Sequence, residues 1–470
     1  MLVDAAPFIL AVSLFVFAAR RPEQGLVVLL AALPLNAFVI LVIGDVVGLT
    51  GLPRVALAAW HDALVGGIAV AAGVALVRAP RPTRPRARLV EALALAVMAL
   101  GAVYVVVAPY ILTALYAYRA LYEPVLLMLA LLVLAHVRGL AGWLPRRAAL
   151  AMVGGGLIAA LAAWPQVYLG GFHYLDVFYH EPGDTLNAAY VGTALAQPRA
   201  VGTFFAPNEF GAYLAVVVGI LAQSRITGLR SVIRAWLLVP ILLALVLSFS
   251  RSGWVTTAVI LVVTSVLAVR AHGRPDLRLA ALRTGRAIAS YGPPIATGLV
   301  LLVAVVLSSH ANDFLDRTIS GTEPSAGGRP QSAVEGAKTV SANPLGVGLG
   351  MAGPKSTRFG EVGDKPVLAS ETWYVAYAMQ VGIGGLLLLL AFVAAMAREL
   401  WRGVRHPWPI LALAVMAGLG TGAVFIPVLD DPNVETPLFA IIALALVVVR
   451  GGLGRPAIRE ATAAAAPAGT

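Results

Sequence analysis

Residues 248–253 read SFSRSG and separate two apolar runs, AWLLVPILLALVL (235–247) and WVTTAVILVVTSVLAV (254–269). So short a polar break between such runs predicts two membrane-spanning helices that are joined by a tight turn. Arg251 is the only charged residue in this whole stretch, and its neighbours in the turn are serines, a phenylalanine and a glycine. The predicted place of this arginine, at a membrane surface, therefore needs a physical explanation.

The composition of the whole chain agrees with the local pattern. Of its 470 residues, 60% are hydrophobic and 12% are charged, and the mean hydropathy is +0.87. Soluble chains carry a charged fraction of about 25%. We therefore predict an all-α polytopic membrane protein with about 12–14 transmembrane helices, and a soluble receptor or nucleic-acid binder is excluded. The chain has no cysteine, which removes disulfides and thiolate chemistry.

Apolar stretches near the length that spans a bilayer recur from end to end. The thirteen predicted spans are 4–19, 25–43, 57–77, 89–107, 119–137, 148–165, 204–222, 236–249, 252–269, 289–308, 371–397, 409–428 and 437–449.

The arginines and lysines predict which way these spans run. With the thirteen spans, 24 of the 34 Lys and Arg residues fall in loops on one side, and 9 fall in loops on the other. Basic loops face the cytoplasm, so the C-terminus is predicted inside and the N-terminus outside. Arg251 then lies on the outer surface, opposite the side on which most of the positive charges lie. The net charge of +11 serves insertion and attraction to anionic lipids, with no nucleic-acid partner implied.

This topology divides the chain into membrane and outer segments. The predicted units are N-terminal transmembrane helices (1–165), a first extracytoplasmic loop (166–203), central transmembrane helices (204–308), a large extracytoplasmic loop (309–370), C-terminal transmembrane helices (371–449) and a cytoplasmic tail (450–470). The large loop contains the helix-compatible run PQSAVEGAKTV, so we expect a small folded lid on the outer face.

Two arginines are predicted anion ligands. Arg251 is an ionisable residue at the edge of a span, and such residues are functional candidates by default. The alternative is an arginine that snorkels to the headgroups. Arg329 follows two glycines and precedes a predicted helix, so its guanidinium would lie near a helix N-terminus, which favours anions. A solvated loop arginine is the alternative there.

Other charged residues at the outer boundary have weaker signals. Glu371 opens a predicted span, where it would either cap the helix or act as a base whose pKa is raised by partial burial. Glu209 lies just inside another span and could point into the same cavity. Arg119 is four residues from Glu123, which favours a structural ion pair. Arg199 is a further candidate anion ligand.

Metal and nucleotide motifs are absent from the sequence. The seven histidines show no metal-site spacing, although His61 and Asp62 could form a buried pair. The glycine-rich stretch LGVGLGMAG (345–353) follows no predicted strand, so it is not read as a dinucleotide loop. We predict no cofactor and no metal.

Taken in order along the chain, several motifs resemble those of the O-antigen ligase and O-antigen polymerase superfamily. They are RAVGTFFAPNEFGAYL (199–214), LSFSRSG (247–253), GGR (327–329), NPLGVGLG (343–350) and ETWYVAYAMQVGIGGLLLLL (371–390). Each motif is weak by itself, but the ordered set with a large outer loop in the right place is fairly specific.

The resemblance implies a glycosyltransferase-C-like membrane enzyme that uses a polyprenyl-diphosphate-linked glycan as donor and a glycan or lipid-core acceptor. It implies donor diphosphate binding by Arg251, Arg329 and Arg199. Family ligases usually have a histidine near the end of the large loop, where this chain has Glu371. That departure resembles the polymerase branch and makes Glu371 the predicted catalytic base.

Three functions follow from this reading. The first is a polymerase of lipid-linked repeat units at the outer face of the bacterial cytoplasmic membrane, acting by an inverting, metal-independent transfer. The second is a ligase that moves the glycan to a lipid core or a protein. The third is a flippase or transporter, which would show charges through its mid-membrane spans and two pseudo-symmetric halves. Most spans here are plain aliphatic.

Overall fold

The computed structural model describes residues 2–80, 88–168, 199–272, 324–352, 370 and 372–453. Its long helices are α1 (Leu2–Arg20), α2 (Pro22–Ala32), α6 (Trp60–Arg78), α7 (Leu89–Val106), α8 (Ile111–Arg138), α9 (Leu144–Tyr168), α12 (Pro207–Ala222), α14 (Ser231–Leu247), α15 (Arg251–His272), α18 (Pro324–Ala342), α19 (Trp373–Trp401), α20 (Pro407–Phe425) and α21 (Pro432–Val449). Helix α2 continues through η1 (Leu33–Leu35), α3 (Asn36–Phe38), η2 (Val39–Ile43) and α4 (Gly44–Val46), and short turns form α5 (Gly51–Ala58), α13 (Ser224–Thr227) and η5 (Val428–Asp430).

The predicted all-α polytopic membrane architecture is confirmed. Within the described ranges, nine helices are long and apolar enough to cross a membrane, and α12 and α14 are shorter apolar helices. The described parts of the chain contain no strand beyond an isolated bridge between Leu140 and Leu453. Helices occupy twelve of the thirteen predicted spans, and the span predicted at 289–308 lies outside the described residues.

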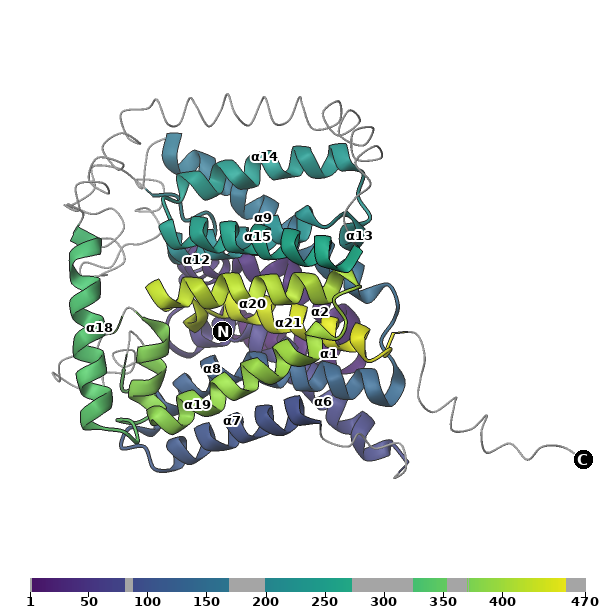
Figure 1. The fold of residues 1–470 in the computed structure, drawn as a ribbon. Helices are drawn as coiled ribbons and strands as arrows, with labels where there is room; N and C mark the ends of the chain where they lie inside the picture. The colour runs from purple at the N-terminus through teal and green to yellow at the C-terminus, as the bar shows by residue number, and fades with distance from the viewer. Residues whose placement is uncertain are drawn as a thin grey trace, which may run out of the picture.

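The long helices lie side by side as a bundle, and α18 runs across one end of it (Figure 1). Helix α21 is buried along most of its length, as expected for a helix that is apolar on every face. A Cβ atom on Gly336 of α18 would lie 2.6 Å from Cγ1 of Val375, so α18 rests closely on the start of α19. The helix predicted within the large loop is therefore present, and it covers the bundle end at which α19 begins.

The bundle has two ends, an Arg251 end and an Arg450 end. The Arg251 end carries the starts of α6, α12, α15, α19 and α21 and the first turns of α8. The Arg450 end carries the start of α7 and the ends of α19 and α21.

Small residues bring α12 and α15 together next to the SFSRSG turn. A Cβ atom built on Gly253 would lie 2.9 Å from the backbone of Gly211, closer than side chains tolerate. Association of membrane helices depends on such close approach, because lipid supplies no hydrophobic force between helices. The two glycines therefore fix the start of α15 against the start of α12.

Helix α19 is broken at Gly382, which adopts φ 73° and ψ 178°. The glycine-rich segment 343–350 fills the break: the Val347 amide donates to the Met379 carbonyl at 2.7 Å, and the Ile383 amide donates to the Pro344 carbonyl at 3.0 Å. Backbone groups freed by the break are thus paired again, as a membrane helix requires.

Candidate functional site

The SFSRSG turn is as tight as predicted. Helix α14 ends at Leu247 and α15 begins at Arg251, so three residues join them. Phe249 in this turn has φ 45°, and it is the one non-glycine residue with a positive φ among those described. A bulky residue in this region carries backbone strain, which persists only where the surroundings hold it in place.

The serines of the turn hold its backbone. The Ser248 hydroxyl donates to the Leu245 carbonyl at 2.7 Å, which ties it to the last turn of α14. The Ser250 hydroxyl accepts from the Gly253 amide at 3.1 Å and so caps the start of α15. The polar residues that interrupt the apolar runs are therefore capping residues for the two helices.

Arg199 holds the turn from the other side. Its Nε donates to the Ser248 carbonyl at 3.1 Å, and its Nη2 donates to the Phe249 carbonyl at 3.1 Å and to Oδ1 of Asn208 at 3.0 Å. Arginine at a helix C-terminus satisfies carbonyl groups that have no partner in the helix. The structure thus shows Arg199 as a support for the turn that carries Arg251.

Arg251 is the first residue of α15, and its side chain is partly exposed. The dipole of a 22-residue helix disfavours a positive side chain at its N-terminus, because the N-terminal amides already carry positive charge. Arg251 and these amides together form a concentration of positive charge that would attract an anion. The anion-binding role of Arg251 stays a prediction.

The structure gives only partial information on two further predicted site residues, Arg329 and Glu371. Arg329 lies in the second turn of α18, which begins at Pro324, so it is further inside the helix than the sequence predicted. Nothing is described of its side chain. Glu371 lies outside the described residues, directly between Ser370, which is buried, and Thr372, which immediately precedes α19.

An acidic layer of Asp62, Glu123, Glu209 and Asp431 lies at the starts of α6, α12 and α21 and on α8. Glu209 is partly buried, and its buried Oε2 atom has no hydrogen-bond partner among the described residues. Its carboxyl group neighbours that of Asp431, which caps α21 by accepting from the Asn433 amide at 2.6 Å. Burial raises the pKa of Asp431, and its contacts with Glu209 and Asn433 only partly offset this.

The predicted ion pair of Arg119 is wrong. Nη1 of Arg119 lies 2.7 Å from Oδ2 of Asp62, on a different helix, and Glu123 faces His61 instead. The pairing of His61 with Asp62 is present as a contact of 3.6 Å. Spacing within one helix could not reveal this arrangement, because α6 and α8 bring together residues that are 57 positions apart in the sequence.

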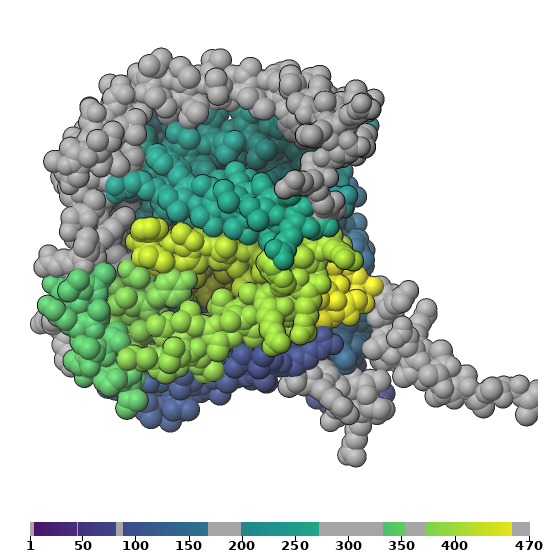
Figure 2. Space-filling view, in the orientation of Figure 1, coloured from purple at the N-terminus to yellow at the C-terminus, as the bar shows by residue number. Residues whose placement is uncertain are grey.

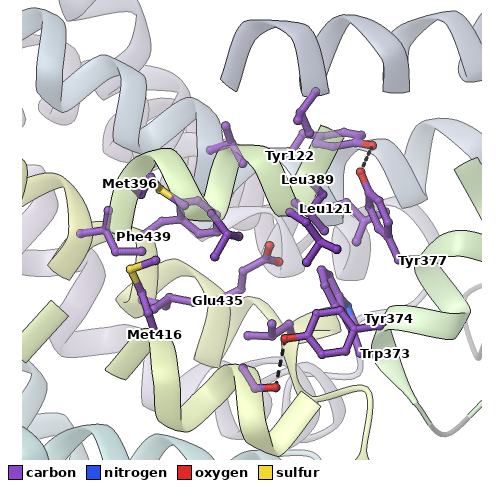
Figure 3. A pocket seen from close by; sticks show the side chains of 18 residues that line it. Leu121, Tyr122, Trp373, Tyr374, Tyr377, Leu389, Met396, Met416, Glu435 and Phe439 are labelled. Atoms are coloured by element: carbon purple, nitrogen blue, oxygen red, sulfur yellow. Dashed lines mark hydrogen bonds between the residues drawn. The ribbon is translucent and has the colours of Figure 1, made fainter. Parts of the chain in front are cut away.

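An apolar cavity of about 90 Å³ lies next to the acidic layer, between α7, α8, α19, α20 and α21. Figure 3 shows aromatic residues at one end of it, where Tyr122 and Tyr377 share a hydrogen bond of 3.3 Å. Met396, Met416 and Phe439 lie together at the other end (Figure 3). The space-filling view shows the molecule hollowed between α19 and the segments above it (Figure 2).

The glycines of segment 343–350 serve packing. A Cβ atom on Gly346 would lie 2.5 Å from the Gln380 carbonyl oxygen, and one on Gly350 would lie 2.7 Å from the Thr113 carbonyl oxygen. The segment therefore fits against α8 and α19 only because these positions have no side chain. That this motif does not bind a nucleotide stays a prediction. In the structure its glycines allow close packing against α8 and α19.

Together these features define a class: a multi-pass, all-helical membrane protein with an arginine-bearing turn, an acidic layer and a covering helix at one end of its bundle. A family model described as O-antigen ligase matches residues 236–390, which include the turn, α18 and the first half of α19. This match supports the O-antigen ligase and O-antigen polymerase superfamily and confirms the resemblance seen in the motifs. No curated protein matches the chain.

The match indicates a bacterial membrane protein of the kind that processes glycans. The matching family implies lipid-linked glycan substrates and a glycosyl-transferring activity. Polymerase and ligase activities occur in the same superfamily, so the match does not separate them.

Proposed function

We propose that the chain is a glycosyltransferase that polymerises polyprenyl-diphosphate-linked repeat units at the outer face of the bacterial cytoplasmic membrane. The observation that carries the proposal is the placement of Arg251. It opens α15 in a strained turn whose serines bond its backbone, at the bundle end that α18 covers, and an apolar cavity lies along α19 in the same bundle. A lipid-linked diphosphate needs positive charge for its head and an apolar environment for its tail.

The residue types suit a single displacement. The acceptor hydroxyl attacks the anomeric carbon of the donor sugar, and the bond from that carbon to the diphosphate oxygen breaks. Arg251 and Arg329 stabilise the negative charge that develops on the diphosphate, since a guanidinium binds phosphate oxygens in a fork and stays charged. Glu371 accepts the proton of the acceptor hydroxyl. The attack inverts the anomeric centre.

Arg199 has a supporting place in this proposal. Three of its donor contacts are made to the turn and to Asn208 beside it, so it positions Arg251 and contributes positive charge to the same end. Glu209 and Arg119 are secondary candidates: Glu209 neighbours Asp431, and Arg119 forms an ion pair with Asp62.

The test uses the full-length protein in lipid nanodiscs with a polyprenyl-diphosphate-linked oligosaccharide. We expect release of polyprenyl diphosphate, and a decrease in turnover of about 10²-fold or more for Arg251→Ala and for Glu371→Gln. The matched control is Arg230→Ala, which removes an exposed arginine at the opposite end of α14. Turnover like that of the wild type in both site variants would refute the site. If both variants lost donor binding to the same extent, Glu371 would serve to bind the donor and would have no role as a base.

Analysis of the product separates the proposal from its alternatives. A ladder of polymer on lipid diphosphate indicates a polymerase. Glycan on a new lipid-core or protein acceptor indicates a ligase. Movement of the donor across the bilayer without a new glycosidic bond indicates a flippase.

A further inference from the structure

Three potential metal ligands meet where the start of α6 packs against α8. Nδ1 of His61 lies 3.6 Å from Oδ1 of Asp62 and 3.6 Å from Oε1 of Glu123. One ligand atom of each of the three residues lies within 4.8 Å of the other two. Two carboxylates and one imidazole thus converge on a common point from two helices.

These separations fit coordination better than hydrogen bonding. A hydrogen bond between nitrogen and oxygen has a length of about 2.7–3.2 Å. A tetrahedral cation with ligands about 2.1 Å away holds those ligands about 3.4 Å from one another. The observed contacts of 3.6 Å are too long for the first and close to the second.

The burial of the cluster is a second, independent indication. The side chains of His61 and Glu123 are 5% and 10% exposed. Oδ1 of Asp62 and Oε1 of Glu123 are both buried, and neither accepts a hydrogen bond from an N–H or hydroxyl donor of the described residues. Through these atoms the two carboxyl groups can bond only each other, and that bond requires one of them to hold a proton. Burial of an unpaired carboxylate oxygen is costly unless a partner compensates it. Both unpartnered oxygens face His61, which is where a cation would satisfy them.

The surroundings resemble the outer layer of a metal site. Nη1 of Arg119 holds the other oxygen of Asp62, Oδ2, at 2.7 Å and so orients that carboxylate. Ligating carboxylates are commonly held in this way by a second group. Asp431 lies within electrostatic range of His61. Around the cluster, three carboxylates therefore face one arginine, and a divalent cation would balance the excess negative charge.

We propose that His61, Asp62 and Glu123 bind one divalent transition-metal cation of the Zn²⁺ type through Nδ1, Oδ1 and Oε1. The imidazole selects against Mg²⁺ and Ca²⁺, which prefer oxygen ligands alone. Three protein ligands leave a position for water. The cation fastens α6 to α8 at the Arg251 end and adds positive charge there. This inference is independent of the glycosyl-transfer proposal.

The experiment measures metal uptake by the full-length protein in detergent micelles, purified through an affinity tag that contains no histidine. After treatment with a chelator and desalting, the protein is titrated with CoCl₂ and followed by its visible absorption, and bound Zn²⁺ is counted by mass spectrometry. We expect one equivalent of Co²⁺ with the absorption of a tetrahedral nitrogen and oxygen site, and a rise in the unfolding temperature. Glu123→Gln and His61→Gln should each lower the affinity at least tenfold.

The matched control is His406→Gln, which removes an exposed histidine at the Arg450 end and should leave uptake unchanged. Wild-type protein that takes up less than one equivalent of Co²⁺ at micromolar concentration would overturn the proposal, even if no variant folds. Equal affinity in the wild type and both cluster variants would also overturn it.

Discussion

The two ends of the bundle hold charge in opposite ways. At the Arg450 end, Nε of Arg450 lies 2.7 Å from Oε1 of Glu399, and its Nη2 lies 3.0 Å from Oε2 of the same residue. Arg450 also bonds Glu91 through Nη1, and Arg88 lies 3.5 Å from Glu399. Two arginines thus meet two glutamates, and helices α7, α19 and α21 are joined by a neutral network.

At the Arg251 end the pairing is incomplete. Asp62, Glu123 and Glu209 each have a buried carboxylate oxygen without a hydrogen-bond partner among the described residues. Arg251 stands at a helix N-terminus, where its charge is disfavoured by the helix dipole. Charged residues that only hold helices together are usually paired with one another. Buried carboxylate oxygens without hydrogen-bond partners, and an arginine at a helix N-terminus, are unfavourable for stability and are consistent with the binding of ligands. The contrast predicts that changes at the Arg450 end affect stability and that changes at the Arg251 end affect function.

The largest effect is expected from Arg450→Met. This change leaves Glu91 and Glu399 partly buried with their main cationic partner removed, which costs about 3–5 kcal/mol in unfolding free energy. The unfolding temperature in detergent should fall steeply, while the release of polyprenyl diphosphate per folded molecule stays unchanged. Arg405→Met, at an exposed arginine of the same end, is the control and should leave the unfolding temperature in place. A loss of activity without a loss of stability in Arg450→Met would break the comparison.

A smaller loss of stability is expected from Gly382→Ala, which tests how rigidly segment 343–350 is held. Gly382 has a backbone conformation that favours glycine, and a Cβ atom there would lie 2.5 Å from the Pro344 carbonyl oxygen. The strain should cost about 3 kcal/mol. The measurement is the unfolding temperature in nanodiscs, with Gly384→Ala as control, because a Cβ atom at Gly384 meets nothing within 4 Å. Equal stability of the two variants would show that the break in α19 adapts freely.

Arg199→Met separates support of the turn from direct binding of the donor. The change removes charge-assisted bonds to the carbonyls of Ser248 and Phe249, which should cost about 2 kcal/mol. If Arg199 acts by holding the turn, the unfolding temperature and the turnover both fall. Turnover that falls at an unchanged unfolding temperature would instead make Arg199 a direct ligand of the diphosphate.

The sequence predicted the membrane helices well because each is a long apolar run whose signal is local. The SFSRSG turn was predicted for the same reason, since a polar break of six residues between such runs leaves room for little else. Its internal bonds were not predictable, because Arg199 and Asn208 reach it from a separate part of the chain.

The contacts within the acidic layer were missed for a related reason, although Glu209 and the pair of His61 and Asp62 were named as candidates. Asp62 and Arg119 come together only when α6 packs on α8, and Glu209 meets Asp431 from a distant part of the chain. Spacing along one helix instead suggested a pair between Arg119 and Glu123, which α8 does not form. The purpose of the glycines in segment 343–350 was likewise hidden, because it depends on how closely the Gln380 carbonyl approaches.

The smallest effect is expected from Asp431→Asn, and it is read from the dependence of stability on pH. Burial raises the pKa of Asp431, so the folded protein binds this proton more tightly than the unfolded chain, whose aspartate has a pKa of about 3.9. The stability contributed by Asp431 is complete below that pH and is lost as the pH rises towards the folded pKa. An asparagine side chain keeps an acceptor for the Asn433 amide and carries no charge, so the variant should lose less stability over this range, by about 1 kcal/mol. Thermal unfolding in detergent at a series of pH values measures this. If the unfolding free energy had the same dependence on pH in both proteins, ionisation of Asp431 would cost little. The charges at the Arg251 end would then destabilise the fold less than their geometry indicates.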